Sequence, residues 1–179
     1  LIRKSSKKKQ NKKEKVYCNT KNMKKDSRNL VFGNFDYLEN DLNGQTVKTR
    51  TIYDVLKKNE KIIGEVCFFD DRELLRKKTA FISLIIELIK CKRLIYIPAL
   101  NNLRYFLPLI YCMSKLFVFK IILIPVGGRN NDFLNKNKLH RLILSKIHVN
   151  LPQVRSEVNE LKVKYNYTNV SYLPNFRIH

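Results

Sequence analysis

The sequence predicts an α/β fold: a Rossmann-like parallel sheet with helices on both faces, preceded by a disordered basic tail. From residue 30 onward, short apolar runs alternate with longer stretches of helical spacing, the pattern of strand–helix–strand units. The apolar runs are nearly continuous, as is typical of strands buried on both sides. The chain has 179 residues, 44% of them hydrophobic, which suits one domain with a substantial core. We expect this domain at residues 29–179 and the tail at residues 1–28.

Six apolar runs are predicted to form the strands. Most of them stop at residues that disfavour a central strand: Asp70 and Asp71 follow the second run, Pro98 the third and Pro174 the last. The predicted strands cover residues 30–35, 62–69, 93–97, 120–126, 147–151 and 169–173.

Five stretches between these runs have helical spacing. In the first, Val47, Ile52 and Val55 fall near one face. The third contains Pro108, which predicts a kink or a late start of that helix. The predicted helices cover residues 45–58, 72–90, 101–117, 132–146 and 154–164.

This order of elements also predicts where a ligand binds. Right-handed crossovers bring the carboxyl ends of all parallel strands to one edge of the sheet, and ligands of such folds bind there. The turn at residues 33–34, the loop after Pro98 and the loop at residues 127–128 are all expected at this edge.

The net charge of +21 at pH 7, with a pI of about 10.0, is extreme and unevenly distributed. Residues 1–28 hold twelve Lys and Arg against two acidic residues, so they carry +10 and the rest of the chain +11. Such a balance favours an anionic partner: nucleic acid, an acidic membrane surface or a phosphorylated substrate. The tail is interpreted either as a solvating segment or as an electrostatic anchor to anionic lipid.

Several classes of protein are not expected. Neither the G-x-x-x-x-G-K-[ST] loop nor the G-x-G-x-x-G fingerprint occurs, which argues against an NTPase or an NAD enzyme. The four cysteines form no Cys-x-x-Cys pair and lie far in sequence from the three histidines, so no metal site is predicted. The apolar stretch 103–126 contains two lysines and two prolines, which argues against a membrane span.

Four stretches together resemble one family. They are residues 43–49 (Asn-Gly-Gln-Thr-Val-Lys-Thr), 95–98 (Ile-Tyr-Ile-Pro), 121–128 (ending Ile-Pro-Val-Gly-Gly) and 169–177 (Asn-Val-Ser-Tyr-Leu-Pro-Asn-Phe-Arg). In content and order they resemble the N-terminal domain of group 1, family-4-type glycosyltransferases, which have the two-domain GT-B architecture. The resemblance covers roughly residues 30–177.

The resemblance implies an enzyme, a hexosyltransferase of cell-surface polysaccharide biosynthesis. Its donor would be a sugar nucleotide, with no other cofactor and no metal, and its acceptor a lipid-linked or saccharide molecule. The widely spaced cysteines indicate a cytoplasmic protein, and the basic charge fits a peripheral position at the inner, anionic face of a membrane. In the family, the donor binds mainly to a C-terminal domain with a Glu-x7-Glu motif, which this chain lacks. Half of the cleft should catalyse little, so the chain alone is expected to be inactive.

The first predicted substrate-binding site is the start of the helix at residues 45–58. A glycine before a helix N-terminus allows close approach, and the free N–H groups there favour an anion. We therefore assign Gly44, Gln45, Thr46 and Lys48 to the donor diphosphate or the acceptor, together with the N–H groups of Thr46 and Val47. The alternative interpretation is a plain helix N-cap.

The second predicted site comprises Gly127, Gly128 and Arg129, suited to an acceptor or a phosphate; the alternative is a turn that needs positive φ. Asn101, Asn102 and Arg104 are interpreted mainly as the cap of their helix, although asparagine side chains also bind sugar hydroxyls. No catalytic residue is predicted.

Three alternatives concern the whole chain. It begins with Leu1 rather than Met, which is expected of a fragment, a processed product or an incomplete reading of a longer gene. It could also be a non-catalytic subunit whose donor domain is a separate chain. A basic nucleic-acid-binding protein is the remaining alternative, but no RRM, KH or helix-turn-helix signature appears, and no nucleic acid partner is expected.

Overall fold

A computed structural model describes residues 28–37, 39, 43–127 and 130–175, without the side chains of residues 130 and 131. It contains a five-stranded sheet in the order β2-β1-β3-β4-β5, in which every pair of neighbours is parallel. The strands are β1 (Asn29–Gly33), β2 (Val66–Asp70), β3 (Arg93–Ile97), β4 (Lys120–Leu123) and β5 (Val149–Asn150). The predicted Rossmann-like α/β fold is therefore confirmed; the predicted tail lies almost wholly outside the described residues.

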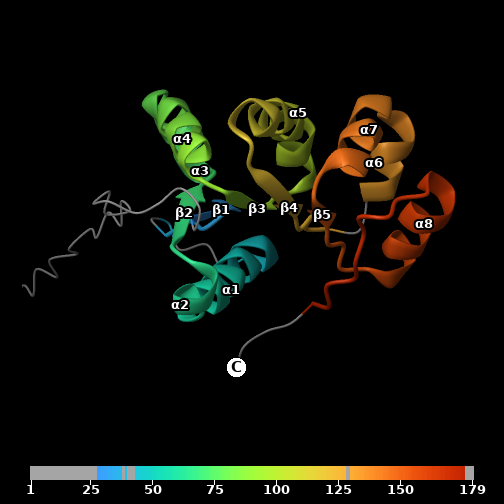
Figure 1. The fold of residues 1–179 in the computed structure, drawn as a ribbon, viewed down its shortest axis with the longest axis horizontal. Helices are drawn as coiled ribbons and strands as arrows, with labels where there is room; N and C mark the ends of the chain where they lie inside the picture. The colour runs from blue at the N-terminus through green and yellow to red at the C-terminus, as the bar shows by residue number, and fades with distance from the viewer. Residues whose placement is uncertain (1–27, 38, 40–42, 128–129, 176–179) are drawn as a thin grey trace, which may run out of the picture.

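Helices connect the strands and cover both faces of the sheet (Figure 1). Helices α3 to α7 lie along one face, α1 and α2 lie on the other, and α8 packs against α6 beyond β5. Their bounds are α1 (Gly44–Lys58), α2 (Glu60–Ile63), α3 (Arg72–Arg76), α4 (Thr79–Lys90), α5 (Leu100–Phe117), α6 (Asn130–Lys136), α7 (Lys138–Lys146) and α8 (Arg155–Tyr165).

The sheet separates two apolar clusters, because successive side chains of a strand point to opposite faces. On β1, Leu30 and Phe32 join the cluster under α4 and α5, whereas Val31 joins the cluster with Ile52 of α1. The rings of Phe32 and Tyr96 stack with centroids 5.1 Å apart, which ties β1 to β3. Burial on both faces explains why the strands are continuous apolar runs in the sequence.

Several predicted boundaries were wrong, each for a local reason. The predicted helix 72–90 is two helices, because Lys77 is extended (φ −140°, ψ 123°) between α3 and α4. The predicted helix 132–146 is likewise divided at Asn137 (φ −125°, ψ 87°). The predicted strand 62–69 begins as the short helix α2, which ends at Gly64 with φ 92°. The predicted last strand consists of one bridge, between Asn150 and Val170.

The third predicted helix starts before its proline, since α5 begins at Leu100 and contains Pro108. The predicted late start is therefore wrong. Among the described residues, none of the helices combines the length and the apolar character that crossing a membrane requires.

Candidate functional site

The strand order reverses between β1 and β3, and we call the region outside the carboxyl ends of these two strands the crevice. After β1 the chain goes to β2 on one side, and after β2 it returns to β3 on the other side of β1, so the strand order reverses between β1 and β3. The last residue of β1, Gly33, is in register with Ile97, the last residue of β3. Ligands of open α/β sheets bind outside the strand ends at such a reversal.

Gly33 allows the two strand ends and α1 to pack closely there. A Cβ on Gly33 would lie 2.9 Å from the carbonyl oxygen of Ile97 and 3.2 Å from Cγ2 of Thr49. Both distances are too short for a side chain to fit without movement of the neighbours. The absence of a side chain at Gly33 therefore allows α1 to pack closely against the ends of β1 and β3.

Polar side chains in the first turn of α1 bridge the crevice. The Nε2 atom of Gln45 donates to the carbonyl oxygen of Ile97 at 3.3 Å. The Oγ1 atom of Thr46 lies 3.4 Å from Oδ1 of Asn34, the residue that follows β1. Two residues of the first predicted site, Gln45 and Thr46, are thus located between the ends of β1 and β3.

The backbone N–H groups of this turn are engaged within the protein. Oδ1 of Asn43 accepts from the N–H groups of Gln45 and Thr46, both at 3.0 Å, and its carbonyl oxygen accepts from Val47 at 3.0 Å. This arrangement is the helix N-cap that was the alternative interpretation of the sequence. An anion bound here while the cap is intact would have to use other groups than the N–H groups of Thr46 and Val47.

Gly44 leaves open space at the helix start. It is exposed, and a Cβ built on it would meet no atom of the described residues within 4 Å. Packing within the described residues therefore does not require glycine at this position. The described residues therefore leave the helix start at Gly44 open for close approach.

Lys48 provides a buried cation one turn further along α1. The residue is only 6% exposed, and its Nζ atom has no hydrogen-bond partner among the residues that the structure describes. Burial lowers the pKa of the Lys48 amine to about 8. Helical side chains lean toward the helix N-terminus, which for Lys48 is the turn that begins with Gly44. A buried amine without a partner is suited to an incoming anion.

Arg50 has a structural role instead. Its guanidinium donates to the carbonyl oxygens of Phe35 and Asp36 at 2.7 and 2.8 Å and lies over the ring of Tyr37. These contacts hold the loop after β1. Of the two basic residues that the sequence places early in this helix, Lys48 is the one without an internal partner in the described part of the chain.

A carboxyl group that the sequence did not single out lies at the end of β2. Asp71 is buried, and its Oδ2 accepts from Nδ2 of Asn102 on α5 at 2.6 Å. Burial and the neighbouring charge of Asp70 raise the pKa of Asp71 to about 6. A carboxyl group with this pKa can exchange a proton near neutral pH. In the sequence, the one indication of this role was the position of Asp71 directly after a predicted strand.

The asparagines at the start of α5 do not cap it. The N-cap residue is Ala99, which makes no side-chain hydrogen bond. Asn102 donates to Asp71 instead, while Asn101 and Arg104 are exposed. The interpretation of these residues as a cap was therefore wrong. The contact of Asn102 with Asp71 joins the start of α5 to the end of β2.

The second predicted site is described only in part. Gly127 is exposed and has φ 103°, so its backbone conformation favours glycine, as the turn interpretation expected. Gly128 and Arg129 lie outside the described residues. Within the described ranges, no cluster of three or more His, Cys, Asp or Glu is arranged to hold a metal ion.

No family model, curated protein or solved structure matches the chain. The likeness to glycosyltransferases therefore stays an expectation from the sequence. What the site can do is judged from its own residues: Lys48 offers a buried positive charge, Gln45 and Thr46 offer polar groups at the crevice, and Asp71 with Asn102 offers a carboxyl–amide pair on the adjacent strand end.

Proposed function

We propose that this chain is the acceptor-side half of a GT-B-type glycosyltransferase. It would transfer a hexose from a sugar nucleotide to a lipid-linked or saccharide acceptor in cell-surface polysaccharide biosynthesis. The parallel sheet and the position of residues 43–49 beside the β1–β3 crevice support this proposal. The other support is the sequence resemblance.

The proposal depends on one observation: the Lys48 amine is buried and has no hydrogen-bond partner among the described residues. Burial of an amine without a hydrogen bond is costly unless a ligand supplies the missing charge and acceptors. A diphosphate, either of the donor or of a lipid-linked acceptor, supplies both. With a pKa of about 8, the amine is mostly charged at pH 7 and becomes more so when an anion binds.

Asp71 and Asn102 suit a different part of the substrate. Their carboxyl and amide groups lie at the end of the neighbouring strand, β2, and at the start of α5. Such groups bind sugar hydroxyls, and a carboxyl with a pKa of about 6 can accept a proton from one. We assign them to the acceptor sugar.

A second wall would complete the cleft. Stabilisation of a departing nucleotide needs groups on both sides of the substrate, so we expect activity only together with a donor-binding domain, which would lie on the same longer protein or on a separate chain. The charge of +21 supports a position at the inner, anionic face of the cell membrane.

Titration with phosphate ligands tests this site. We would measure binding of UDP, inorganic diphosphate and uridine to the full chain at pH 7 by calorimetry. UDP and diphosphate are expected to bind and uridine is not. Lys48→Met should weaken both phosphate ligands by roughly tenfold to a hundredfold, since it removes a charge-assisted contact.

Lys58→Met is the matched control, because it removes the same charge from an exposed position at the other end of α1. It should change the affinity less than about twofold, the effect expected of a distant exposed charge. Equal weakening by the two substitutions would mean that only the general positive charge attracts phosphate. In that case the assignment of Lys48, and with it this proposal, would be abandoned.

A further inference from the structure

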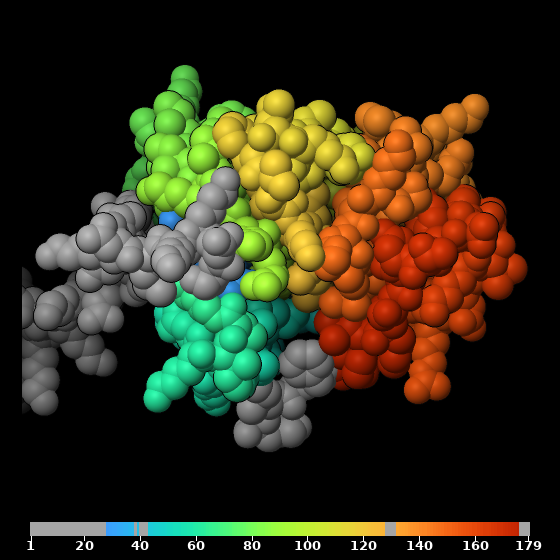
Figure 2. Space-filling model, viewed as in Figure 1, coloured from blue at the N-terminus to red at the C-terminus, as the bar shows by residue number. Residues whose placement is uncertain are grey.

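Helices α4, α5 and α7 share a layer whose outer side is unusually apolar. They lie next to one another along the same face of the sheet (Figure 1), and their atoms form a continuous row along the upper side of the molecule (Figure 2). The side chains that pack inward are Leu84 and Leu88 on α4, Leu103 and Leu107 on α5 and Leu144 on α7. The opposite sides of these helices, at about 180° from those leucines, face away from the sheet.

Large apolar side chains occupy these outward positions. Ile82 is 60% exposed, Leu116 is 72% exposed and Leu142 is 54% exposed. We call the outward apolar residues of the three helices the α4–α5–α7 face. Its members are Ile82, Ile86, Tyr105, Leu116, Leu139 and Leu142. A single exposed apolar residue is ordinary, but six on one layer of adjacent helices need an explanation.

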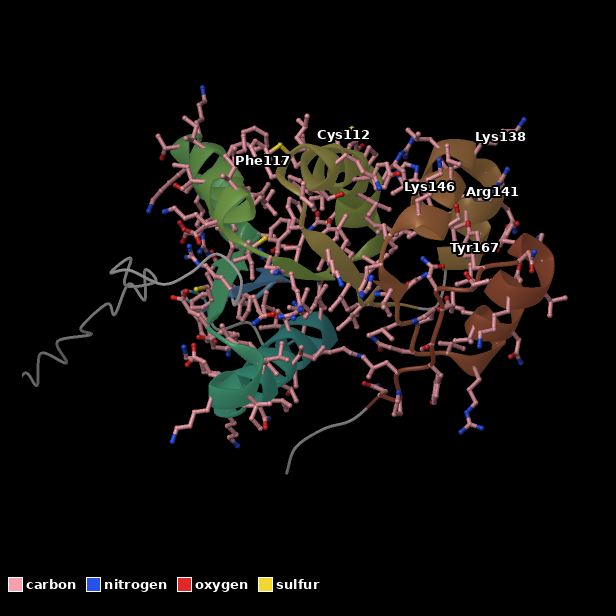
Figure 3. All side chains as sticks on the ribbon, in the orientation of Figure 1. Cys112, Phe117, Lys138, Arg141, Lys146 and Tyr167 are labelled. Atoms are coloured by element: carbon pink, nitrogen blue, oxygen red, sulfur yellow. The ribbon has the colours of Figure 1, made fainter. Side chains whose placement is uncertain are left out.

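Cations are interleaved with these apolar residues. Arg104 and Lys115 on α5 and Lys138 and Lys146 on α7 are all exposed. Figure 3 shows Cys112 of α5 and Lys138 of α7 along the same outer side of the molecule. The sequences of the three helices contain one acidic residue, Glu87, and it is paired with Arg28 at 2.6 Å. The face is therefore apolar and basic with no unpaired carboxylate of its own.

We propose that the α4–α5–α7 face lies on an anionic lipid bilayer, with its apolar side chains inserted among the acyl chains and its cations at the headgroups. Interfacial helices have this combination of a positive charge and large apolar side chains. Lysine is depleted at interfaces between proteins, whereas it binds anionic headgroups and can extend its amine from an apolar surface. The charge complementarity therefore favours lipid over a second protein. This inference does not depend on the proposed glycosyl transfer, because none of its residues belongs to the Lys48 site.

The absence of tryptophan from the chain makes a direct test possible. Leu116→Trp places a single indole reporter on the face. The matched control is Val163→Trp on α8, an exposed position (86%) outside the three helices. With vesicles of phosphatidylcholine and phosphatidylglycerol, the indole emission of the Leu116→Trp protein should shift to the blue and be quenched by brominated acyl chains. The indole emission of the Val163→Trp protein should stay that of a solvated side chain.

A second pair of measurements separates this face from the charged tail. The full chain is co-sedimented with the same vesicles at low and at high salt. Ile82→Ser combined with Ile86→Ser should weaken vesicle binding roughly tenfold at high salt, where apolar insertion dominates over charge. Equal responses of the two indole reporters, or no effect of the double substitution, would overturn the proposal. A blue shift of the Leu116→Trp protein that grows with protein concentration in the absence of lipid would identify a second copy as the occupant and would also overturn it.

Discussion

The imidazole of His140 on α7 replaces a hydrogen bond that Pro108 removes from α5. Its Nε2 atom lies 2.9 Å from the carbonyl oxygen of Arg104, which is four residues before Pro108. In a regular helix this carbonyl would accept from the N–H of residue 108, and proline has none. A carbonyl oxygen only accepts, so Nε2 donates and carries the ring proton. The contact explains how a proline is accommodated inside α5 and how α7 is fixed to it.

This relationship predicts a coupling between the two positions. His140→Leu keeps an apolar contact with Phe133 but leaves the Arg104 carbonyl unpaired, and we expect it to cost about 1–3 kcal/mol of unfolding free energy. In a Pro108→Ala background the cost should be smaller by about 1 kcal/mol or more, because the introduced alanine supplies the missing backbone N–H. Urea denaturation of the four proteins of the cycle measures the coupling. Equal costs in the two backgrounds would show that the hydrogen bond is not what joins the helices.

Two glycines beside the crevice should respond in opposite ways to alanine. Gly33→Ala forces a Cβ to within 2.9 Å of the Ile97 carbonyl oxygen, and we expect a loss of about 1–3 kcal/mol. Gly44→Ala meets no atom of the described residues within 4 Å and improves helix propensity, so the stability of this variant should stay the same or rise by less than about 1 kcal/mol. Thermal denaturation compares them. If Gly44 allows close approach of a ligand, Gly44→Ala weakens diphosphate binding while the fold stays intact; a loss of stability would point to a packing role instead.

Lys48 should make stability depend on alkaline pH. The pKa of its amine falls from 10.5 to about 8 on folding, so between these values the unfolded state binds more protons and stability rises with pH. Below pH 8 the full cost of burying the charge remains. Lys48→Met should therefore be more stable than the natural chain at pH 7, by up to about 3 kcal/mol, and this advantage should shrink between pH 8 and 10.5.

Urea denaturation at pH 7 and at about pH 9.5 measures this effect as a difference between the two proteins, which cancels the titration of the other lysines and tyrosines. Lys58→Met, at an exposed position, should show no comparable change with pH. Lower stability of Lys48→Met at pH 7 would mean that the amine has a stabilising partner in the folded protein.

Asp71 should make the stability of the protein depend on pH in the acidic range. Its pKa rises from 3.8 to about 6 on folding, so the folded state binds more protons in this window and stability falls as pH rises through it. Asp71→Asn keeps an oxygen that accepts from Asn102 but has no charge to bury. It should be more stable than the natural chain by up to about 3 kcal/mol at about pH 7.5 and equal to it below about pH 4.

The matched control for this prediction is Asp132→Asn, which neutralises an exposed carboxylate on α6. Denaturation curves from about pH 4 to about pH 8 should show no growing advantage for this variant. An Asp71→Asn protein that is destabilised at every pH would indicate that the carboxylate is stabilised, rather than penalised, by its surroundings.

Much of the fold could be predicted because strands that are buried on both faces appear in the sequence as continuous apolar runs. The predicted strand 93–97 coincides with β3, and the predicted helix 45–58 differs from α1 by one residue at its start. Boundaries failed where the backbone angles of one residue interrupt a helix, as at Lys77 and Asn137. Lys favours helices, and the weaker propensity of one Asn is routinely overridden by tertiary contacts, so neither residue type predicts the interruption.

For the candidate site, the sequence predicted the residue types but not their contacts. A glycine, a polar pair and a lysine at the start of a helix suggested an anion site, and Lys48 was named among them. That Asn43 occupies the neighbouring N–H groups, that Lys48 is buried without a partner in the described residues, and that Asp71 meets Asn102 are properties of the tertiary structure. The spacing of apolar residues along the sequence indicates which side of a helix or strand is buried. It does not indicate which polar atoms meet across elements distant in sequence, because those contacts depend on the relative positions of whole helices and strands.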